Sequence, residues 1–107
     1  MTPLSVLPAP TVYFAGTRCR VDVRHYGNQR LALQLTHADT GEPVALATLN
    51  VLDQAVNPDE CLIQIHGEHQ RLLLDTLIAA SIIQRPHRML WDDTIGLIPV
   101  CRLATGL

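Results

Sequence analysis

The strongest constraint on the fold is a regular alternation of apolar and polar side chains early in the chain. Between positions 18 and 24, Cys19, Val21 and Val23 alternate with charged residues, and between 31 and 36 three leucines alternate with Ala, Gln and Thr. A period of two predicts β-strands with one buried face. Gly27-Asn28-Gln29-Arg30 separates the two runs, and this turn sequence predicts that they pair as antiparallel neighbours.

Four further runs have strand character. They are residues 11–15, 44–51, 61–65 and 95–103. The run Val44–Val51 is apolar on both faces, which predicts a central strand covered on each side. Pro99 lies inside the last run, and because proline lacks a backbone N–H, an edge strand or a bulge is expected there. Residues 85–94 are interpreted as a loop.

One helix is predicted over Gln70–Ile83, ending before Pro86, which cannot continue it. Its apolar face is broad and is formed by Leu73, Leu74, Leu77, Ile78, Ser81 and Ile82. A face this wide exceeds what one sheet contact requires. We expect the helix to be largely buried in its own domain, with a dimer interface as the alternative.

These elements predict an α+β fold, namely an antiparallel β-meander of four to five strands with one helix packed on a face. The chain has 107 residues, which suits one domain. Residues 1–10 contain three prolines and are interpreted as a flexible leader, so the single domain is expected to span residues 11–107.

Composition narrows the function classes. Ten carboxylates face eight arginines, for a formal charge of −2, which disfavours both an acidic DNA mimic and a strongly basic nucleic-acid binder. The absence of lysine excludes Schiff-base chemistry and the phosphate-loop lysine. Three widely spaced cysteines, no signal-peptide pattern and no long apolar run predict a reduced, cytoplasmic protein outside the membrane.

Candidate catalytic residues are few, and each has a simpler structural interpretation. His66, Glu68 and His69 could begin a zinc site, but no second ligand pair has matching spacing, so we interpret them as a solvated helix entry. The parity of Cys19 and Cys61 indicates buried thiols, whereas Cys101 is ambiguous. The carboxylate pairs Asp59-Glu60 and Asp92-Asp93 are interpreted as turn residues. The sequence therefore predicts no catalytic residue, no metal site and no cofactor, and a protein that is not an enzyme.

The most distinctive surface feature is an arginine stripe on one face of the strand at 18–24. Arg18, Arg20 and Arg24 share that face, and Tyr26 continues its parity. Three guanidinium groups in a row could hold phosphates or carboxylates of a partner. Asp22 lies on the same face and partly neutralises it, so a solvated sheet face is the alternative.

Several short segments resemble small uncharacterised proteins carried by bacterial plasmids and phages, and they span about residues 12–103. These segments are Tyr26-Gly27-Asn28, Leu31-Ala32-Leu33-Gln34-Leu35, Asp39-Thr40-Gly41-Glu42-Pro43, Ala47-Thr48-Leu49-Asn50, Leu74-Asp75-Thr76-Leu77-Ile78 and Ile98-Pro99-Val100-Cys101-Arg102-Leu103. The segment before the helix is distantly similar to antirestriction proteins, although His66-Gly67-Glu68-His69 stands where those proteins carry an acidic, aromatic stretch. The resemblance implies a mobile-element context and transfers no catalytic residue.

Two functions are consistent with these observations. The first is a non-enzymatic inhibitor of a bacterial defence system, of anti-CRISPR or antirestriction type, that acts by contact with a host nuclease or surveillance complex. The second is an accessory protein that binds nucleic acid or another anion through the arginine stripe. Either protein is expected to be a monomer or a homodimer.

Overall fold

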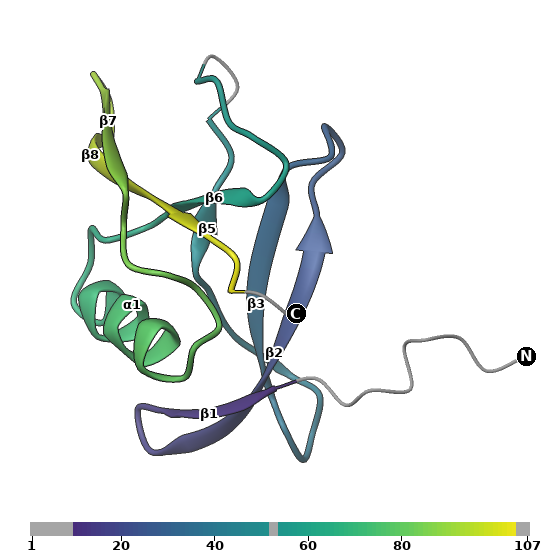
Figure 1. The fold of residues 1–107 in the computed structure, drawn as a ribbon. Coiled ribbons are helices and arrows are strands. Elements are labelled where there is room, and N and C mark those ends of the chain that lie inside the picture. The colour runs from purple at the N-terminus through teal and green to yellow at the C-terminus, as the bar shows by residue number, and fades with distance from the viewer. Residues whose placement is uncertain (1–9, 52–53, 105–107) are drawn as a thin grey trace, which may run out of the picture.

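The computed structural model describes residues 10–51 and 54–104, which form two antiparallel sheets and one helix (Figure 1). Sheet A has the strand order β1 (Thr11–Phe14), β2 (Thr17–His25), β3 (Leu31–His37), β4 (Pro43–Leu46). Sheet B has the order β5 (Thr48–Leu49), β6 (Glu60–Ile63), β8 (Gly96–Arg102), β7 (Arg88–Asp92). The helix α1 spans Gln70–Ala79.

The predicted α+β class and the antiparallel meander are confirmed. In sheet A the four strands follow one another in chain order. The structure adds a second four-stranded sheet to the expected architecture. The predicted leader falls almost wholly on residues 1–9, which lie outside the described residues. Pro10 is described, and its carbonyl accepts a hydrogen bond from the Val21 N–H at 2.8 Å.

The alternation in β2 has the predicted orientation over most of its length. Cys19 and Val21 are buried, and Leu31, Leu33 and Leu35 line the facing strand. Val23 departs from the prediction, because it is 38% exposed although it shares the parity of the buried residues. The end of β2 is therefore partly uncovered, whereas Leu31 and Leu33 opposite it in β3 stay buried.

The run Val44–Val51 is not a central strand, contrary to the expectation from its apolar character. It divides into β4, at the edge of sheet A, and β5, at the edge of sheet B. Ala47 stands between them and is fully buried. Its N–H donates to Leu33 O at 2.9 Å and its carbonyl accepts from Gln64 N at 3.0 Å, so this one residue joins both sheets.

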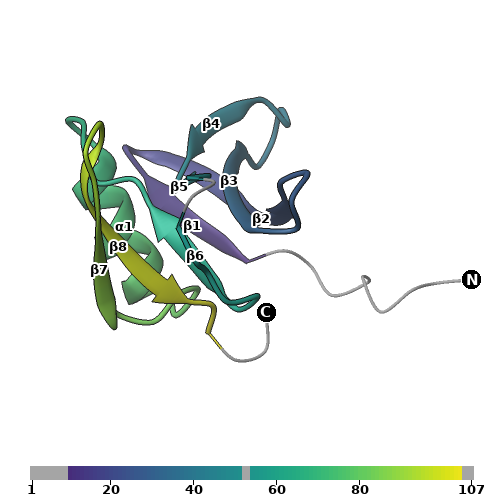
Figure 2. The ribbon, with the colours of Figure 1, turned by 90° about the horizontal axis from the view of Figure 1, so that it is seen from above.

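The main core lies between sheet A, sheet B and α1. Figure 2 shows β2, β3 and β4 on one side of the molecule, with β7, β8 and α1 on the other. The helix contributes Leu73 and Leu77, both buried. A smaller core of Val51, Leu62, Ile98 and Val100 covers the opposite face of sheet B. Sheet B is thus covered on both faces at β6 and at the C-terminal half of β8. The predicted packing of the helix against the sheets is confirmed.

The helix ends at Ala79, four residues earlier than predicted. Ser81 adopts a left-handed conformation with φ 59°, and two bonds close the end, from Ser81 N to Ile78 O and from Ile82 N to Leu77 O, both 3.0 Å. This is a Schellman motif with serine where glycine is usual. It turns Ile82 and Ile83 into the core, so their helical spacing in the sequence was misleading.

Pro99 does not place β8 at an edge, as the sequence predicted. β8 lies between β6 and β7, and Pro99 is buried opposite Met89. The ladder between β6 and β8 ends at the pair Leu62–Val100. Pro99 lies one residue past that end, where its missing N–H removes no ladder bond.

Candidate functional site

The β7–β8 hairpin carries an exposed apolar surface. Met89, Trp91 and Leu97 are 48%, 62% and 47% exposed, and their positions share one face of the hairpin because Trp91 pairs with Leu97 and Met89 with Pro99. We call Met89, Trp91 and Leu97 the hairpin face. In Figure 1 the end of the hairpin points away from α1. Its opposite face packs in the smaller core through Leu90, Ile95 and Ile98. Aromatic and methionine side chains exposed together are typical of protein-binding surfaces.

The segment that holds this face differs from the sequence prediction. The sequence pattern predicts a loop over residues 85–94, but Arg88–Asp92 form the strand β7. The sequence feature that could have predicted this strand is the run Met89-Leu90-Trp91, which precedes the turn residues Asp92 and Asp93. Its alternation was hard to recognise because the exposed face is the apolar one.

The outer edge of β7 is not paired with another strand of the described chain. In an antiparallel ladder, residues whose backbone groups bond the neighbouring strand alternate with residues whose groups point away. Val100 O accepts from His87 N at 3.1 Å, so the even-numbered residues of β8 bond toward β7. The backbone polar groups of Leu97 and Pro99 therefore point away from β7. Their partners across the hairpin, Trp91 and Met89, direct their N–H and C=O groups to the outer edge of β7.

Side-chain contacts agree with this parity. From outside β7, Gln54 Nε2 donates to Trp91 O at 3.1 Å. On the opposite side of β8, His66 Nε2 lies 2.9 Å from Leu97 O, and because a carbonyl only accepts, Nε2 carries the proton. The outer edge therefore offers the backbone groups of two residues, and one of the two carbonyls is bonded by Gln54.

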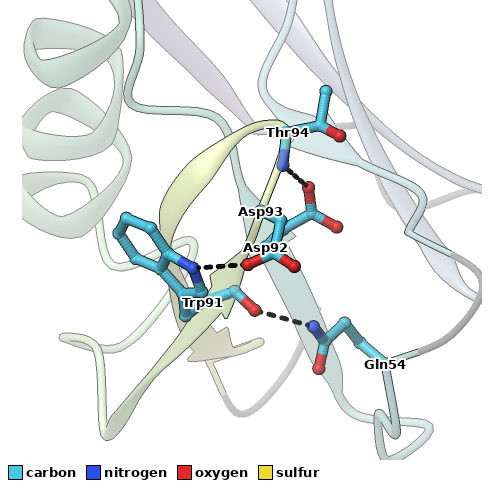
Figure 3. A pocket seen from close by; sticks show the side chains of 5 residues that line it. All are labelled: Gln54, Trp91, Asp92, Asp93 and Thr94. Carbon is cyan, nitrogen blue, oxygen red and sulfur yellow. Dashed lines mark hydrogen bonds between the residues drawn. The ribbon is translucent and has the colours of Figure 1, made fainter.

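A shallow pocket of about 280 Å³ lies at the hairpin tip (Figure 3). Its lining is Gln54, Trp91, Asp92, Asp93 and Thr94. The indole N–H of Trp91 donates to Asp93 Oδ1 at 3.0 Å, which fixes the ring beside the turn. Asp92 Oδ1 accepts the N–H groups of Thr94 and Ile95, each at 2.9 Å. The prediction of turn chemistry for Asp92 is confirmed, and the bonds orient Trp91 before any partner arrives.

A buried carboxylate anchors the base of the hairpin. Glu60 is 1% exposed, so it is not the solvated turn residue predicted with Asp59. Arg88 Nη2 donates to its Oε1 at 2.9 Å, Asn57 N donates to the same oxygen at 2.9 Å, and His87 contacts its Oε2. The Arg88 guanidinium, with smaller contributions from Asn57 and His87, lowers the pKa of Glu60 to about 2 despite burial. This ionised group fixes the start of β7 to β6.

The arginine stripe is largely engaged within the strand. Arg20 Nε donates to Asp22 Oδ1 at 2.7 Å, and Arg24 Nη2 lies 3.8 Å from Asp22 Oδ2. The hydrogen bond from Arg20 is the main cause that lowers the pKa of Asp22. Tyr26 does not continue the stripe, because its hydroxyl lies 3.0 Å from Thr48 Oγ1 and ties the end of β2 to β5. Arg18 and Arg24 remain exposed on this face.

The structure places the other candidate residues as follows. His66, Glu68 and His69 are exposed before α1, and in the described part of the chain no group of three or more His, Cys, Asp or Glu side chains could hold a metal ion. Cys19, Cys61 and Cys101 are all buried, as predicted for the first two. Cys61 and Cys101 are paired across β6 and β8, and burial raises their pKa values to about 12 and about 11.

Comparison with protein-family models, with curated proteins and with solved structures found no match to this chain. Among residues 10–51 and 54–104, no helix has the length and apolar character needed to span a membrane.

Proposed function

We propose that this protein is a non-enzymatic binding protein that contacts a partner protein through the hairpin face. One observation carries the proposal: Met89, Trp91 and Leu97 are exposed together on one face of the β7–β8 hairpin. The partner that best accounts for the resemblance to plasmid and phage proteins is a component of a bacterial defence system, which the protein would inhibit by occupying its surface.

The chemistry of the hairpin face supports this proposal. Exposing three large apolar side chains to water is unfavourable by about 25 cal/mol for each Å² of apolar surface, and a partner removes that cost on binding. Trp is one of the residues enriched at the energetic centres of protein interfaces. The indole is also held by Asp93, so little rotational freedom is lost when it is buried.

The test is a protection assay. The chain is expressed in bacteria that carry a restriction or CRISPR system, and the plating efficiency of a sensitive phage is measured. We expect the wild type to raise plating and Trp91→Ala to abolish most of that gain, because truncating a central interface Trp costs about 2 kcal/mol or more, or about 30-fold in affinity.

Tyr13→Ala is the matched control. Tyr13 is an aromatic residue 73% exposed on β1, far in the sequence from the hairpin and in the other sheet. It should retain full protection. Equal protection by wild type and Trp91→Ala would exclude the hairpin face as the contact surface. No protection by the wild type against any tested system would exclude the defence-inhibitor function.

A further inference from the structure

We infer that two copies of this chain pair through the outer edges of β7, which joins their two sheets B into one continuous sheet. The proposed partner of this strand edge is therefore a second copy of the same chain. The inference begins from the backbone parity described above: of the strand Arg88–Asp92, Met89 and Trp91 direct their N–H and C=O groups outward. Unpaired edge groups of this kind are a template for another strand.

The spacing of these groups is self-complementary. If the edges meet antiparallel with Leu90 at the two-fold axis, Met89 of one copy lies opposite Trp91 of the other. The two residues then exchange both of their N–H···O bonds, and the symmetry repeats the exchange. This register uses every outward group of β7. Two other registers place Met89 opposite Met89, or Trp91 opposite Trp91, at the two-fold axis. Each of them uses only half of the outward N–H and C=O groups there.

The side chains fit the same register. In a bonded antiparallel pair the two Cα atoms lie about 5.5 Å apart, which brings the Met89 thioether of one copy beside the Trp91 ring of the other. Thioether–aromatic contacts are favourable. No charged side chain lies on this face of β7, where edge strands commonly carry lysine to prevent such pairing.

The pairing also has a consequence for the proposed function. A two-fold axis perpendicular to the sheet leaves both hairpin faces on the same side. Met89, Trp91 and Leu97 of the two copies then form one apolar surface of twice the size. Such a surface suits a partner protein that has two-fold symmetry or a long apolar ridge. This use of the surface rests on the proposed function, whereas the pairing itself is tested without any partner.

Gln54 is the only described side chain with a hydrogen bond to an outward backbone group of β7. Its amide must leave Trp91 O when a second copy pairs, so it weakens the association. Replacing it removes this competition in both copies.

The experiment is sedimentation velocity of the purified full chain from about 10 μM to about 1 mM, the range for small interfaces. The wild type should show a monomer–dimer equilibrium. Met89→Glu/Trp91→Glu should be a monomer, because the register places like charges opposite each other. Met89→Lys/Trp91→Glu should restore the dimer, since Lys then lies opposite Glu and only in the proposed register.

Both double variants replace exposed side chains, so they should fold, and circular dichroism is the measurement that checks this. Gln54→Ala, which alters neither face residue, should strengthen association about tenfold. A wild type that stays monomeric at the highest concentration overturns the inference and leaves the phage assay unaffected. Equal behaviour of the two double variants, or no gain from Gln54→Ala, overturns the register.

Discussion

Replacing Glu60 by Gln should remove a stabilising charge from the interior. The carboxylate is 1% exposed, and its pKa falls from the usual 4.5 to about 2, chiefly through the hydrogen bond from Arg88. One pKa unit corresponds to about 1.36 kcal/mol between the two protonation states, so the ionised form contributes about 3 kcal/mol at neutral pH. Gln has the shape of the protonated acid and lacks this contribution.

The sign of the pH dependence follows from the lowered pKa. The contribution is fully present above the unfolded pKa of 4.5 and is lost as pH falls through the folded value of about 2. The difference in unfolding free energy between the wild type and Glu60→Gln should be about 3 kcal/mol at pH 7. It should fall to about half of that at pH 3 and to below about 1 kcal/mol at pH 2.

Urea unfolding at each pH measures this difference. The signal should be far-UV circular dichroism, because the single tryptophan, Trp91, is exposed and reports folding weakly. Asp59→Asn is the control: Asp59 is the neighbouring carboxylate, exposed and 3.5 Å from Arg102, and its loss should cost below about 1 kcal/mol. A Glu60→Gln difference that stays constant from pH 7 to pH 2 would refute the reasoning.

Three other predictions concern the core and the helix. Ser81→Gly should raise the free energy of unfolding by about 1 kcal/mol, measured by thermal melting, because glycine adopts φ 59° without steric cost; a destabilised variant contradicts this. Cys61 and Cys101 should react with a disulfide reagent only after unfolding, since burial raises their pKa values to about 12 and about 11; rapid labelling of both in the native protein contradicts this. Leu77→Ala should cost about 2–5 kcal/mol in urea unfolding, and the half-exposed Leu72→Ala below about 1 kcal/mol; equal losses would contradict the burial of one helix face.

Local periodicity was sufficient to predict part of the fold. The alternation in β2 and β3 and the start of α1 at Gln70 follow from neighbours in sequence, and the structure confirms them. The division of the run Val44–Val51 could not be predicted in this way. An apolar run is the same whether it forms one central strand or two edge strands that join two packed sheets.

The candidate site was harder to predict than the fold. The hairpin face is apolar, whereas the exposed face of a strand is normally polar. The alternation of side chains in this segment therefore did not predict which face of the strand is buried. Glu60 is separated by 28 residues from Arg88, its principal partner. Its burial depends on that partner, and the adjacent Asp59 suggested a solvated turn instead.

The junction at Ala47 has a mechanical consequence. Because its N–H is bonded within sheet A and its carbonyl to the residue after β6, neither sheet can separate from the other without breaking a backbone bond of this residue. Ala47 alone connects Leu46 at the end of β4 to Thr48 at the start of β5. A single residue inserted there would move every side chain of β5 to the opposite face of sheet B. Circular permutation or loop grafting should therefore avoid this position, and the two sheets should lose their amide protection together when the protein unfolds.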